Sequence, residues 1–390
     1  MDFTRQLDIP DRSFFLFGPR GVGKSHFLRK AAFADAAFDL LRHALAIEFM
    51  RDPSLLEARL GDLPRNAWVW IDEVQRVPAI LDEVHRLIET RHWRFALSGS
   101  SARKLRRQGG NLLAGRAISR RMESLTSHEM GARYNVGNAV AWGTLPLVAQ
   151  DYAAAADVLA AYVDTYLREE IREEGLIRKV EPFLRFIEVA GLMNGQQVNA
   201  SAISRQAQLP RASVDVYFSI LEDTLVGHRL AAFQPKLKVQ EQNHPKFYWF
   251  DPGVARAAAG LLTQPVDSLW IGPALETLIY HELRVYGQIS RKEPCLSYYR
   301  TKSGMEVDFI IELEKATLSR KAKVICLEVK SSKRWDRSWG AAMREMAASS
   351  AVHVVGMYGI YMGDAAYRFD ALSALPVTEF LSRLHSGGIY

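Results

Sequence analysis

The chain of 390 residues is long enough for two or three domains, each with its own hydrophobic core. Hydrophobic residues make up 48% of it, yet no uninterrupted apolar stretch reaches the roughly 18 residues that span a bilayer. The charged N-terminal stretch MDFTRQLDIPDR lacks the apolar core of a signal peptide, and two cysteines are too few for a disulfide framework. We therefore expect a cytoplasmic protein, and its net charge of +6 permits an anionic partner.

A glycine-rich segment near the start of the chain, FFLFGPRGVGKSHF at residues 14–27, fits the phosphate-loop pattern G-x-x-x-x-G-K-[ST] in full. The apolar run 14–17 predicts a buried strand, and a helical pattern begins at Lys24. In that context the N–H groups of the loop and of the helix N-terminus converge on phosphates. We expect Lys24 to reach the β- and γ-phosphates of ATP and Ser25 to bind Mg²⁺. The residues expected to hold the nucleotide are Gly18, Pro19, Arg20, Gly21, Val22, Gly23, Lys24 and Ser25.

Two further buried strands are expected to end near this loop. In WVWIDEVQ, the strand 68–71 is followed by Asp72, which we expect to hold Mg²⁺ through water, and by Glu73, which we expect to polarise the attacking water. In WRFALSGSS, the strand ends in hydroxyls, and Ser98 or Ser100 is expected to sense the γ-phosphate. Together the three strand ends predict a P-loop ATPase with a separate catalytic glutamate. Residues 10–150 resemble the AAA-like group of that superclass.

A basic run follows the third strand, with seven Lys or Arg residues and no acid between residues 101 and 121. Such a run fits a solvated face, a nucleic-acid contact, or an arginine finger offered to a neighbouring subunit of a homo-oligomer. Arg116 is the preferred finger because its surroundings in LLAGRA are apolar and glycine-rich. The seven residues are Arg103, Lys104, Arg106, Arg107, Arg116, Arg120 and Arg121.

The middle of the chain has a helical pattern. From residue 153 to 190, alanines and charge clusters such as YLREEIREEG give a helical period with acids and bases spaced for i,i+4 pairs. The next segment, 198–226, predicts a short helix, a turn at Leu209 and Pro210, and a longer helix, with HRLAAF and KFYWF as strands of a wing. The outward candidates are mixed in charge, so DNA readout and a packing or protein-docking role both remain. These candidates are Arg211, Ser213, Asp215, Ser219 and Glu222.

The last third of the chain contains a second group of candidate catalytic residues. GPALETLIYHEL predicts a helix that carries Glu276 and Glu282, and GMEVDFIIELE predicts a strand that carries Asp308. In the strand KVICLEVKSS, Glu328 and Lys330 lie two residues apart and face the same way. A hairpin would bring the strands of Asp308 and Glu328 side by side. We therefore expect these two carboxylates to share Mg²⁺, with Lys330 beside the attacking water.

Phrases along nearly the whole chain, among them GPRGVGK, WIDEVQ, SGSS, YWFDPG and LEVKSS, resemble a bacterial family in which an AAA-type ATPase precedes a C-terminal domain of unknown function. That C-terminal domain is similar to the restriction-endonuclease fold with its D-(D/E)-x-K site. The resemblance implies that Glu276 joins Asp308, Glu328 and Lys330 as catalytic groups, although Val307 stands where the motif expects proline. The fold class expected is α/β, with an AAA-type P-loop ATPase domain at 1–150, a helical and winged-helix-like domain at 151–255, and a restriction-endonuclease-like domain at 256–390.

Two functions fit this organisation. In the first, ATP turnover drives an enzyme that binds DNA or RNA and cuts it at the C-terminal site. In the second, the ATPase is a switch that exposes the helical middle to a protein partner, and the nuclease-like domain is a platform that does not cut. Salt-sensitive binding to nucleic acid favours the first function. Partner capture that depends on nucleotide but not on the C-terminal carboxylates favours the second, and neither function involves a membrane.

Overall fold

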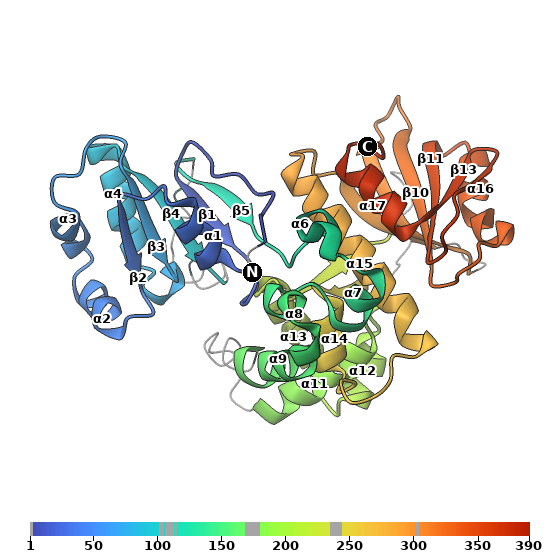
Figure 1. Cartoon of the computed structure of the whole chain (residues 1–390), viewed down its shortest axis with the longest axis horizontal. Coiled ribbons are helices and arrows are strands. Elements are labelled where there is room, and N and C mark those ends of the chain that lie inside the picture. Colours follow the sequence, from blue (N-terminus) through green and yellow to red (C-terminus); the bar gives the residue numbers. More distant parts are fainter. Residues whose placement is uncertain are drawn as a thin grey trace.

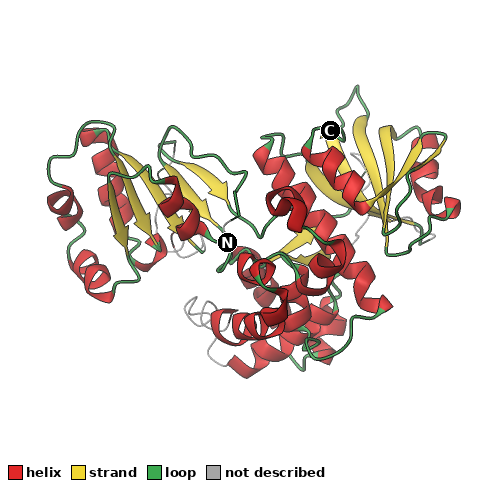
Figure 2. Ribbon diagram, viewed as in Figure 1, coloured by secondary structure: helices red, strands yellow, loops and turns green. Residues whose placement is uncertain are grey.

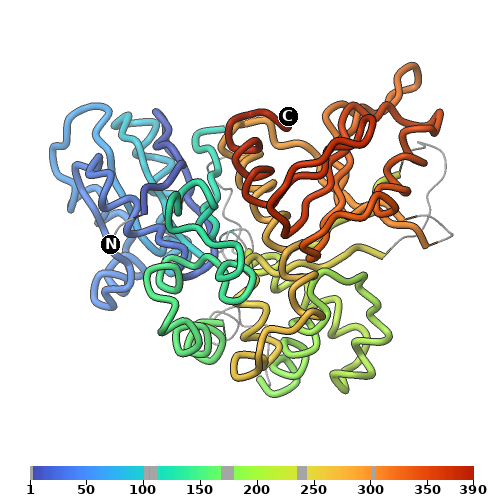
Figure 3. The backbone as a smooth tube through the Cα atoms, turned by 45° about the vertical axis from the view of Figure 1, so that its right-hand side comes forward, coloured from blue at the N-terminus to red at the C-terminus, as the bar shows by residue number. Residues whose placement is uncertain are grey.

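The computed structural model arranges the chain in three parts (Figure 1). An N-terminal sheet with its helices and a C-terminal sheet with its helices flank a mainly helical middle, as the colours of Figure 2 show. Figure 3 follows the backbone from the first sheet through the middle to the second sheet. The structure describes residues 3–100, 105, 113, 115–167, 180–234, 244–300 and 304–390.

The N-terminal sheet has five parallel strands in the order β2-β3-β4-β1-β5. The three strands and the helix expected around the phosphate loop are present as β1, β3, β4 and α1. Parallel neighbours need crossover connections, which the helices between the strands supply. The strands are β1 (Phe14–Phe17), β2 (Ala36–Asp39), β3 (Trp68–Asp72), β4 (Arg94–Gly99) and β5 (Ile118–Arg121), and the helices are α1 (Lys24–Ala31), α2 (His43–Arg51), α3 (Leu55–Leu60), η1 (Val74–Arg76) and α4 (Ile80–Arg91).

Alternate side chains of β1 enter two different cores, because successive residues of a strand point to opposite faces. Phe15 and Phe17 pack with apolar residues of α2, α3 and α4. Phe14 and Leu16 pack in a core that continues into the helical middle. One face of the sheet is therefore covered by its own helices, and the other connects it to the rest of the molecule.

The middle is built from short helices and one pair of strands. Helix α7 packs against α14 and α15, and the loop after α7 is held by Asp251, whose Oδ2 accepts a hydrogen bond from the Thr144 N–H at 2.7 Å. Within the described ranges, no helix is long and apolar enough to cross a membrane. The elements are α6 (Ser127–Met130), η2 (Gly131–Arg133), α7 (Val136–Trp142), α8 (Pro146–Gln150), η3 (Tyr152–Ala154), α9 (Ala155–Ala161), the π-helix η4 (Tyr162–Leu167), α11 (Val180–Leu192), α12 (Ala200–Gln206), α13 (Arg211–Asp223), β6 (Gly227–Leu230), β7 (Lys246–Trp249) and α14 (Pro252–Ala258).

The helix pair expected from the sequence is present as α12 and α13, with the turn at Leu209 and Pro210 between them. The strands β6 and β7 follow as an antiparallel pair. Phe218 of α13 packs edge-on against Phe247 of β7, with 4.8 Å between the ring centroids. The helix pair and the strand pair therefore form one packed unit, while the i,i+4 charge pairs expected within 168–175 lie outside the described residues.

The C-terminal sheet has six strands in the order β12-β13-β11-β10-β9-β8 and mixes parallel with antiparallel pairs. The strands β9 and β10 are antiparallel neighbours, so the hairpin expected from the sequence is present. The elements of this part are α15 (Ser268–Ile289), β8 (Cys295–Arg300), β9 (Glu306–Glu314), β10 (Ala322–Lys330), η5 (Arg337–Gly340), α16 (Ala341–Ala348), β11 (Val352–Tyr361), β12 (Tyr367–Phe369), β13 (Leu372–Pro376) and α17 (Val377–His385).

Helix α15 connects the C-terminal part to the segment that leaves the N-terminal sheet. The Glu282 Oε1 atom accepts a hydrogen bond from the Ser127 N–H at 2.6 Å, and Arg284 Nη2 lies 2.7 Å from Glu123 Oε1. Six residues before Glu282, the side chain of Glu276 contacts residues of the middle instead. The two glutamates therefore contact different parts of the molecule, because side chains six positions apart on one helix point in different directions.

Candidate functional site

The phosphate loop between β1 and α1 has a backbone that only glycine accommodates easily. Gly21 and Gly23 have φ angles of 81° and 93°, in the left-handed region that other residues avoid. At Gly18, a Cβ atom would lie 2.0 Å from the carbonyl oxygen of Met122. A glycine loop of this kind can turn successive backbone N–H groups toward one bound phosphate.

Lys24 lies at the start of α1 with only 6% of its surface exposed. Its Nζ donates hydrogen bonds to the carbonyl oxygens of Gly18 at 2.7 Å and Pro19 at 3.0 Å. An ammonium held by neutral carbonyls can exchange one of them for a phosphate oxygen, which gives a stronger, charge-assisted hydrogen bond. Ser25 follows on the same turn, and its hydroxyl and the Asp72 carboxylate are oxygen donors of the kind that Mg²⁺ prefers.

Asp72 ends β3 and is 4% exposed. Its Oδ1 accepts a hydrogen bond from Ser98 Oγ at 2.5 Å, and Ser98 Oγ accepts one from Trp70 Nε1 at 2.8 Å. Because Ser98 is fully buried, these contacts make it a support for the Asp72 carboxylate. The contact of Ser98 or Ser100 with a γ-phosphate stays a prediction.

Glu73 follows Asp72 with a φ of 55°, an uncommon value for a residue other than glycine and one that often marks a functional site. Its carboxylate accepts a hydrogen bond from Gln75 Nε2, which also donates to Ser100 Oγ at 3.2 Å. Burial raises the pKa of Glu73, although the nearby charge of Lys24 opposes this. A carboxylate with a raised pKa is better suited to accept a proton from water at neutral pH.

Gln75 is a candidate functional residue that sequence reasoning missed. A Cβ atom at Gly99 would lie 2.2 Å from Gln75 Oε1, so the glycine at the end of β4 leaves room for this amide. The amide in turn fixes the direction of the Glu73 carboxylate. The sequence carries only a weak signal for this, a polar residue two positions after the acid, because the contact with Gly99 depends on the pairing of β3 with β4.

A cavity of about 460 Å³ opens beside the phosphate loop. Its walls come from the loop, α1, the N-terminal segment, the segment after β5 and α8, and they are mainly apolar. Sequence reasoning missed this cavity because its walls are far apart in the chain. The apolar residues that line it include Phe3, Val22, Phe27, Met122, Leu125, Pro146 and Leu147.

Arg116, the expected arginine finger, lies before β5 and donates a hydrogen bond to Glu89 of α4. Its side chain is 38% exposed, so it is accessible from outside the chain. Its role as a finger stays a prediction. Of the rest of the basic run, Arg120 and Arg121 lie in β5. Arg103, Lys104, Arg106 and Arg107 lie outside the described residues.

Helix α13 presents a surface of mixed charge. Arg211 and Asp215 are exposed, whereas Ser213 and Ser219 are half-buried. Glu222 pairs with Arg229 of β6, with 3.1 Å between Oε2 and Nη2. The outward candidates on α13 therefore do not form a uniformly basic face.

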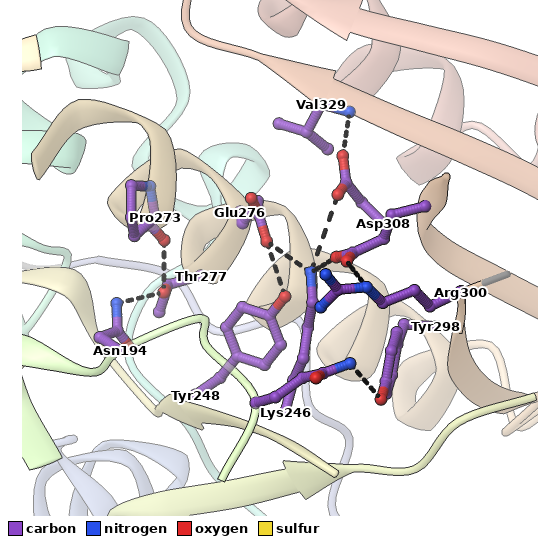
Figure 4. A network of polar contacts seen from close by, with 12 residues as sticks. Asn194, Lys246, Tyr248, Pro273, Glu276, Thr277, Tyr298, Arg300, Asp308 and Val329 are labelled. Atoms are coloured by element: carbon purple, nitrogen blue, oxygen red, sulfur yellow. Dashed lines mark hydrogen bonds and ion pairs between the residues drawn. The ribbon is translucent and has the colours of Figure 1, made fainter. Parts of the chain in front are cut away.

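The expected C-terminal site residues lie close together. Glu276 comes from α15, Asp308 from β9, and Glu328 and Lys330 from β10. Lys330 Nζ donates to Glu328 and lies 4.0 Å from Asp308 Oδ2. The same Asp308 oxygen accepts a hydrogen bond from the Val329 N–H at 2.8 Å (Figure 4). We call Glu276, Glu306, Asp308 and Glu328 the carboxylate cluster.

Sequence reasoning missed Lys246, the first residue of β7, which reaches into this cluster from the middle part (Figure 4). Its Nζ forms an ion pair with Glu306 and lies 3.3 Å from Glu276 Oε2 and 3.8 Å from Asp308 Oδ1. A lysine that begins the buried aromatic run KFYWF was the available signal, because a charge at such a position needs a partner.

The carboxylate cluster as it stands does not fit the metal ion that we expected at Asp308 and Glu328. Among the residues that the structure describes, no three His, Cys, Asp or Glu side chains are arranged to hold a metal ion. The physical reason is that the ammonium groups of Lys246 and Lys330 already pair with these carboxylates and lie where a metal ion would bind.

Protonation in the cluster is strongly perturbed. Burial and the negative charge of Asp308 raise the pKa of Glu276 to about 7 and that of Glu328 to about 8. Burial opposes the charged form of Lys246, but the surrounding carboxylates outweigh it and raise the pKa of this lysine. Tyr248 donates a hydrogen bond to Glu276 Oε2 at 2.8 Å. Such perturbed groups in one cluster mark a candidate functional site.

The parallel sheet and the groups at its strand ends define the N-terminal part as a P-loop nucleotide-binding domain. In agreement, residues 10–131 match the family model described as an AAA domain, which supports an AAA-type P-loop ATPase and therefore ATP binding. Residues 134–265 and 271–380 match two models that are each described as a domain of unknown function, DUF8612 and DUF4143.

No curated protein sequence matches the chain. Among solved structures, that of the Aeropyrum pernix Orc1 protein in complex with DNA is similar at 10% sequence identity, and the match covers 65% of this chain and 86% of that chain. The TM-score of this match is 0.29, which is too low to define a common overall fold.

Proposed function

We propose that the chain binds and hydrolyses ATP with Mg²⁺ at the phosphate loop, and that the nucleotide state controls how the middle and C-terminal parts act on a nucleic acid. The observation that carries the proposal is the placement of Lys24, Asp72 and Glu73. They lie on the loop after β1 and at the end of β3 in a parallel sheet, beside a cavity of about 460 Å³.

Each group at this site has a chemical role that its surroundings support. Lys24 binds the phosphates, because its ammonium is buried and held by two carbonyls. Ser25 and Asp72 hold Mg²⁺, which neutralises developing charge on the phosphates. Glu73 orients water and accepts its proton, with Gln75 fixing the carboxylate.

The apolar cavity beside the loop suits the base of the nucleotide. Binding pockets for flat ring systems are mostly apolar, with a few polar groups that fix orientation. Phe27 lies on α1, and Leu147 lies on α8, which belongs to the following helical part. A base bound between Phe27 and Leu147 would connect the nucleotide to both the N-terminal part and the helical middle.

Contacts between the loop and the π-helix η4 offer a route from nucleotide to the middle. A Cβ atom at Gly21 would lie 3.4 Å from the ring of Tyr162, and the Arg20 guanidinium lies 5.5 Å from the ring centroid of Tyr166. Tyr162 also lies 6.2 Å, centroid to centroid, from Phe250, the residue after β7. A shift of the loop on ATP binding would therefore press on η4 and on β7.

We propose that nucleic acid is the substrate of the nucleotide-driven change. The net charge of +6, the winged-helix-like order of α12, α13, β6 and β7, and the endonuclease-like grouping of Asp308, Glu328 and Lys330 support this. Arg116 is proposed as a finger that completes the ATPase site of a neighbouring copy in a homo-oligomer.

A second function is supported by one specific observation, the pairing of Lys246 and Lys330 with the carboxylates. Carboxylates that are already paired with lysines support a function in which the chain is an ATP-driven switch for a protein partner. In that function the nuclease-like domain is a platform that does not cut.

The test is ATP turnover measured with and without a panel of single- and double-stranded DNA and RNA. The first function predicts stimulation by at least one nucleic acid, with binding that weakens as salt rises. Turnover that no nucleic acid changes, together with binding of none of them, would leave the switch as the better account. Absence of ATP turnover under all conditions would contradict both.

A further inference from the structure

Lys246 occupies the place among the carboxylates that a cation would take. Its Nζ lies within 4 Å of oxygens from Glu276, Glu306 and Asp308, which come from two different elements, α15 and β9. Only 4% of the residue is exposed. An ammonium buried this deeply is tolerated because several carboxylates pair with it.

One oxygen of the cluster still lacks a partner. Glu328 Oε1 accepts a hydrogen bond from Lys330, but Glu328 Oε2 is shielded from solvent and has no hydrogen-bond partner. The Glu328 side chain is 7% exposed, so bulk solvent does not reach this oxygen. A buried carboxylate oxygen without a partner is costly, and it points to a ligand that the present arrangement excludes.

Lys246 and the carboxylates belong to different parts of the molecule. The backbone on either side of Lys246 is bound to the loop after α11, through hydrogen bonds from Val198 N to Pro245 O at 2.8 Å and from Gly195 N to Phe247 O at 2.7 Å. The carboxylates belong to the C-terminal sheet and α15. The lysine is therefore supplied by a different part of the chain from the acids, and Tyr248 of β7 also binds the cluster through its hydrogen bond to Glu276 of α15.

We propose that Lys246 is an internal cation that closes the carboxylate cluster to divalent metal ions. This inference rests on the proposed C-terminal site, but not on its cutting anything. Removal of this ammonium would leave oxygens of Glu276, Asp308 and Glu328 available to a metal ion. The position of this ammonium explains why a cluster with a nuclease-like set of acids has no place for a metal ion among the described residues.

The experiment measures Mn²⁺ binding in the full chain without nucleotide, by the electron paramagnetic resonance signal of free Mn²⁺. The variant is Lys246→Met, which keeps the apolar stem and removes the charge. We expect about tenfold tighter Mn²⁺ binding than in the wild type, because the ion no longer has to displace a paired ammonium. The gain should disappear in the double variant Lys246→Met with Asp308→Asn. Lys246→Arg is the matched control, and it should bind Mn²⁺ as weakly as the wild type.

Each other outcome also decides the question. If Lys246→Met fails to fold without metal, the proposal requires Mn²⁺ to restore its cooperative thermal unfolding, and no restoration overturns it. Mn²⁺ binding that is no tighter in a folded Lys246→Met variant also overturns it. ATP binding is measured on the same preparations and separates this inference from the proposed function. If the chain bound no ATP, the proposed function would fail, but the expected Mn²⁺ result would be unchanged. Mn²⁺ binding without cleavage supports the inference and the non-cutting platform together.

Discussion

The phosphate loop and the carboxylate cluster contain the same two kinds of group, a buried lysine and carboxylates, but in opposite arrangements. At the loop, Lys24 donates to backbone carbonyls, and the acids are held by the neutral side chains of Ser98 and Gln75. At the cluster, the lysines bind the acids directly. The partner of a lysine, more than its presence, therefore decides whether a site is ready for a charged ligand or already paired with its own side chains.

The largest expected effect is on hydrolysis at the loop. Glu73→Gln keeps the shape of the side chain but removes its basicity, so we expect the rate of ATP hydrolysis to fall by about 10²–10⁴-fold while ATP still binds. Single-turnover hydrolysis and equilibrium ATP binding check this. Glu57→Gln changes a half-buried acid of the same domain that pairs with Arg86 and Arg91, and this control should hydrolyse ATP normally. Wild-type hydrolysis by Glu73→Gln would place the base elsewhere.

The next effect is on ATP affinity. Lys24→Ala removes a charge-assisted hydrogen bond worth about 1.5–3 kcal/mol, so we expect the Kd for ATP to rise by about 10–100-fold. Isothermal titration calorimetry measures it. Lys323→Ala, which removes a half-buried lysine of β10 in the C-terminal sheet, is expected to leave the Kd unchanged. Equal ATP affinity of Lys24→Ala and the wild type would remove the loop from the account.

A smaller effect tests whether Gln75 positions Glu73. Gly99→Ala places a Cβ where Gln75 Oε1 now lies, so the amide must move. We expect hydrolysis to fall by about tenfold with unchanged ATP affinity, because a small misplacement of the base affects the chemical step more than binding. In Gly272→Ala the added Cβ meets nothing closer than 3.9 Å, which makes it a suitable control. If both variants hydrolyse ATP at the same rate, Gln75 is not a positioning residue.

The smallest effect concerns pH and stability. Burial, and then the charges of Arg284 and Arg121, hold the pKa of His228 well below its usual 6.5. The unfolded chain takes up a proton below about pH 6.5 while the folded chain does not, so stability falls as the pH drops through that range. Between pH 7 and pH 5.5, we expect the free energy of unfolding to fall by about 1 kcal/mol less in His228→Gln than in the wild type. Urea unfolding at both pH values measures this, and equal losses would contradict it. His353→Gln changes an exposed histidine and serves as the control.

Local patterns were sufficient to predict the N-terminal fold. The strand, loop and helix around Lys24 follow one another within 18 residues, so their apolar runs and glycines specify them directly. The same holds for the strand that ends at Asp72 and for the hairpin that brings Asp308 beside Glu328. In each case the chemistry and the structural signal lie in the same short segment.

Contacts between distant segments were not predictable in this way. Lys246 meets Glu276 and Asp308 although 30 and 62 positions separate them from it, and one sequence shows no local pattern that pairs them. The cavity beside the loop is closed partly by Leu147 of α8, which packs with the middle. Tertiary packing, rather than periodicity, decides these contacts.

The central claim is that the phosphate loop is ready for its ligand and that the carboxylate cluster is closed by Lys246. The most direct test counts the Mn²⁺ ions bound to the wild-type chain with and without a non-hydrolysable ATP analogue. The account predicts no tightly bound Mn²⁺ without the analogue and one with it, and the bound ion should be lost in Lys24→Ala and kept in Asp308→Asn. A tightly bound Mn²⁺ in the absence of nucleotide that Asp308→Asn removes would contradict the account.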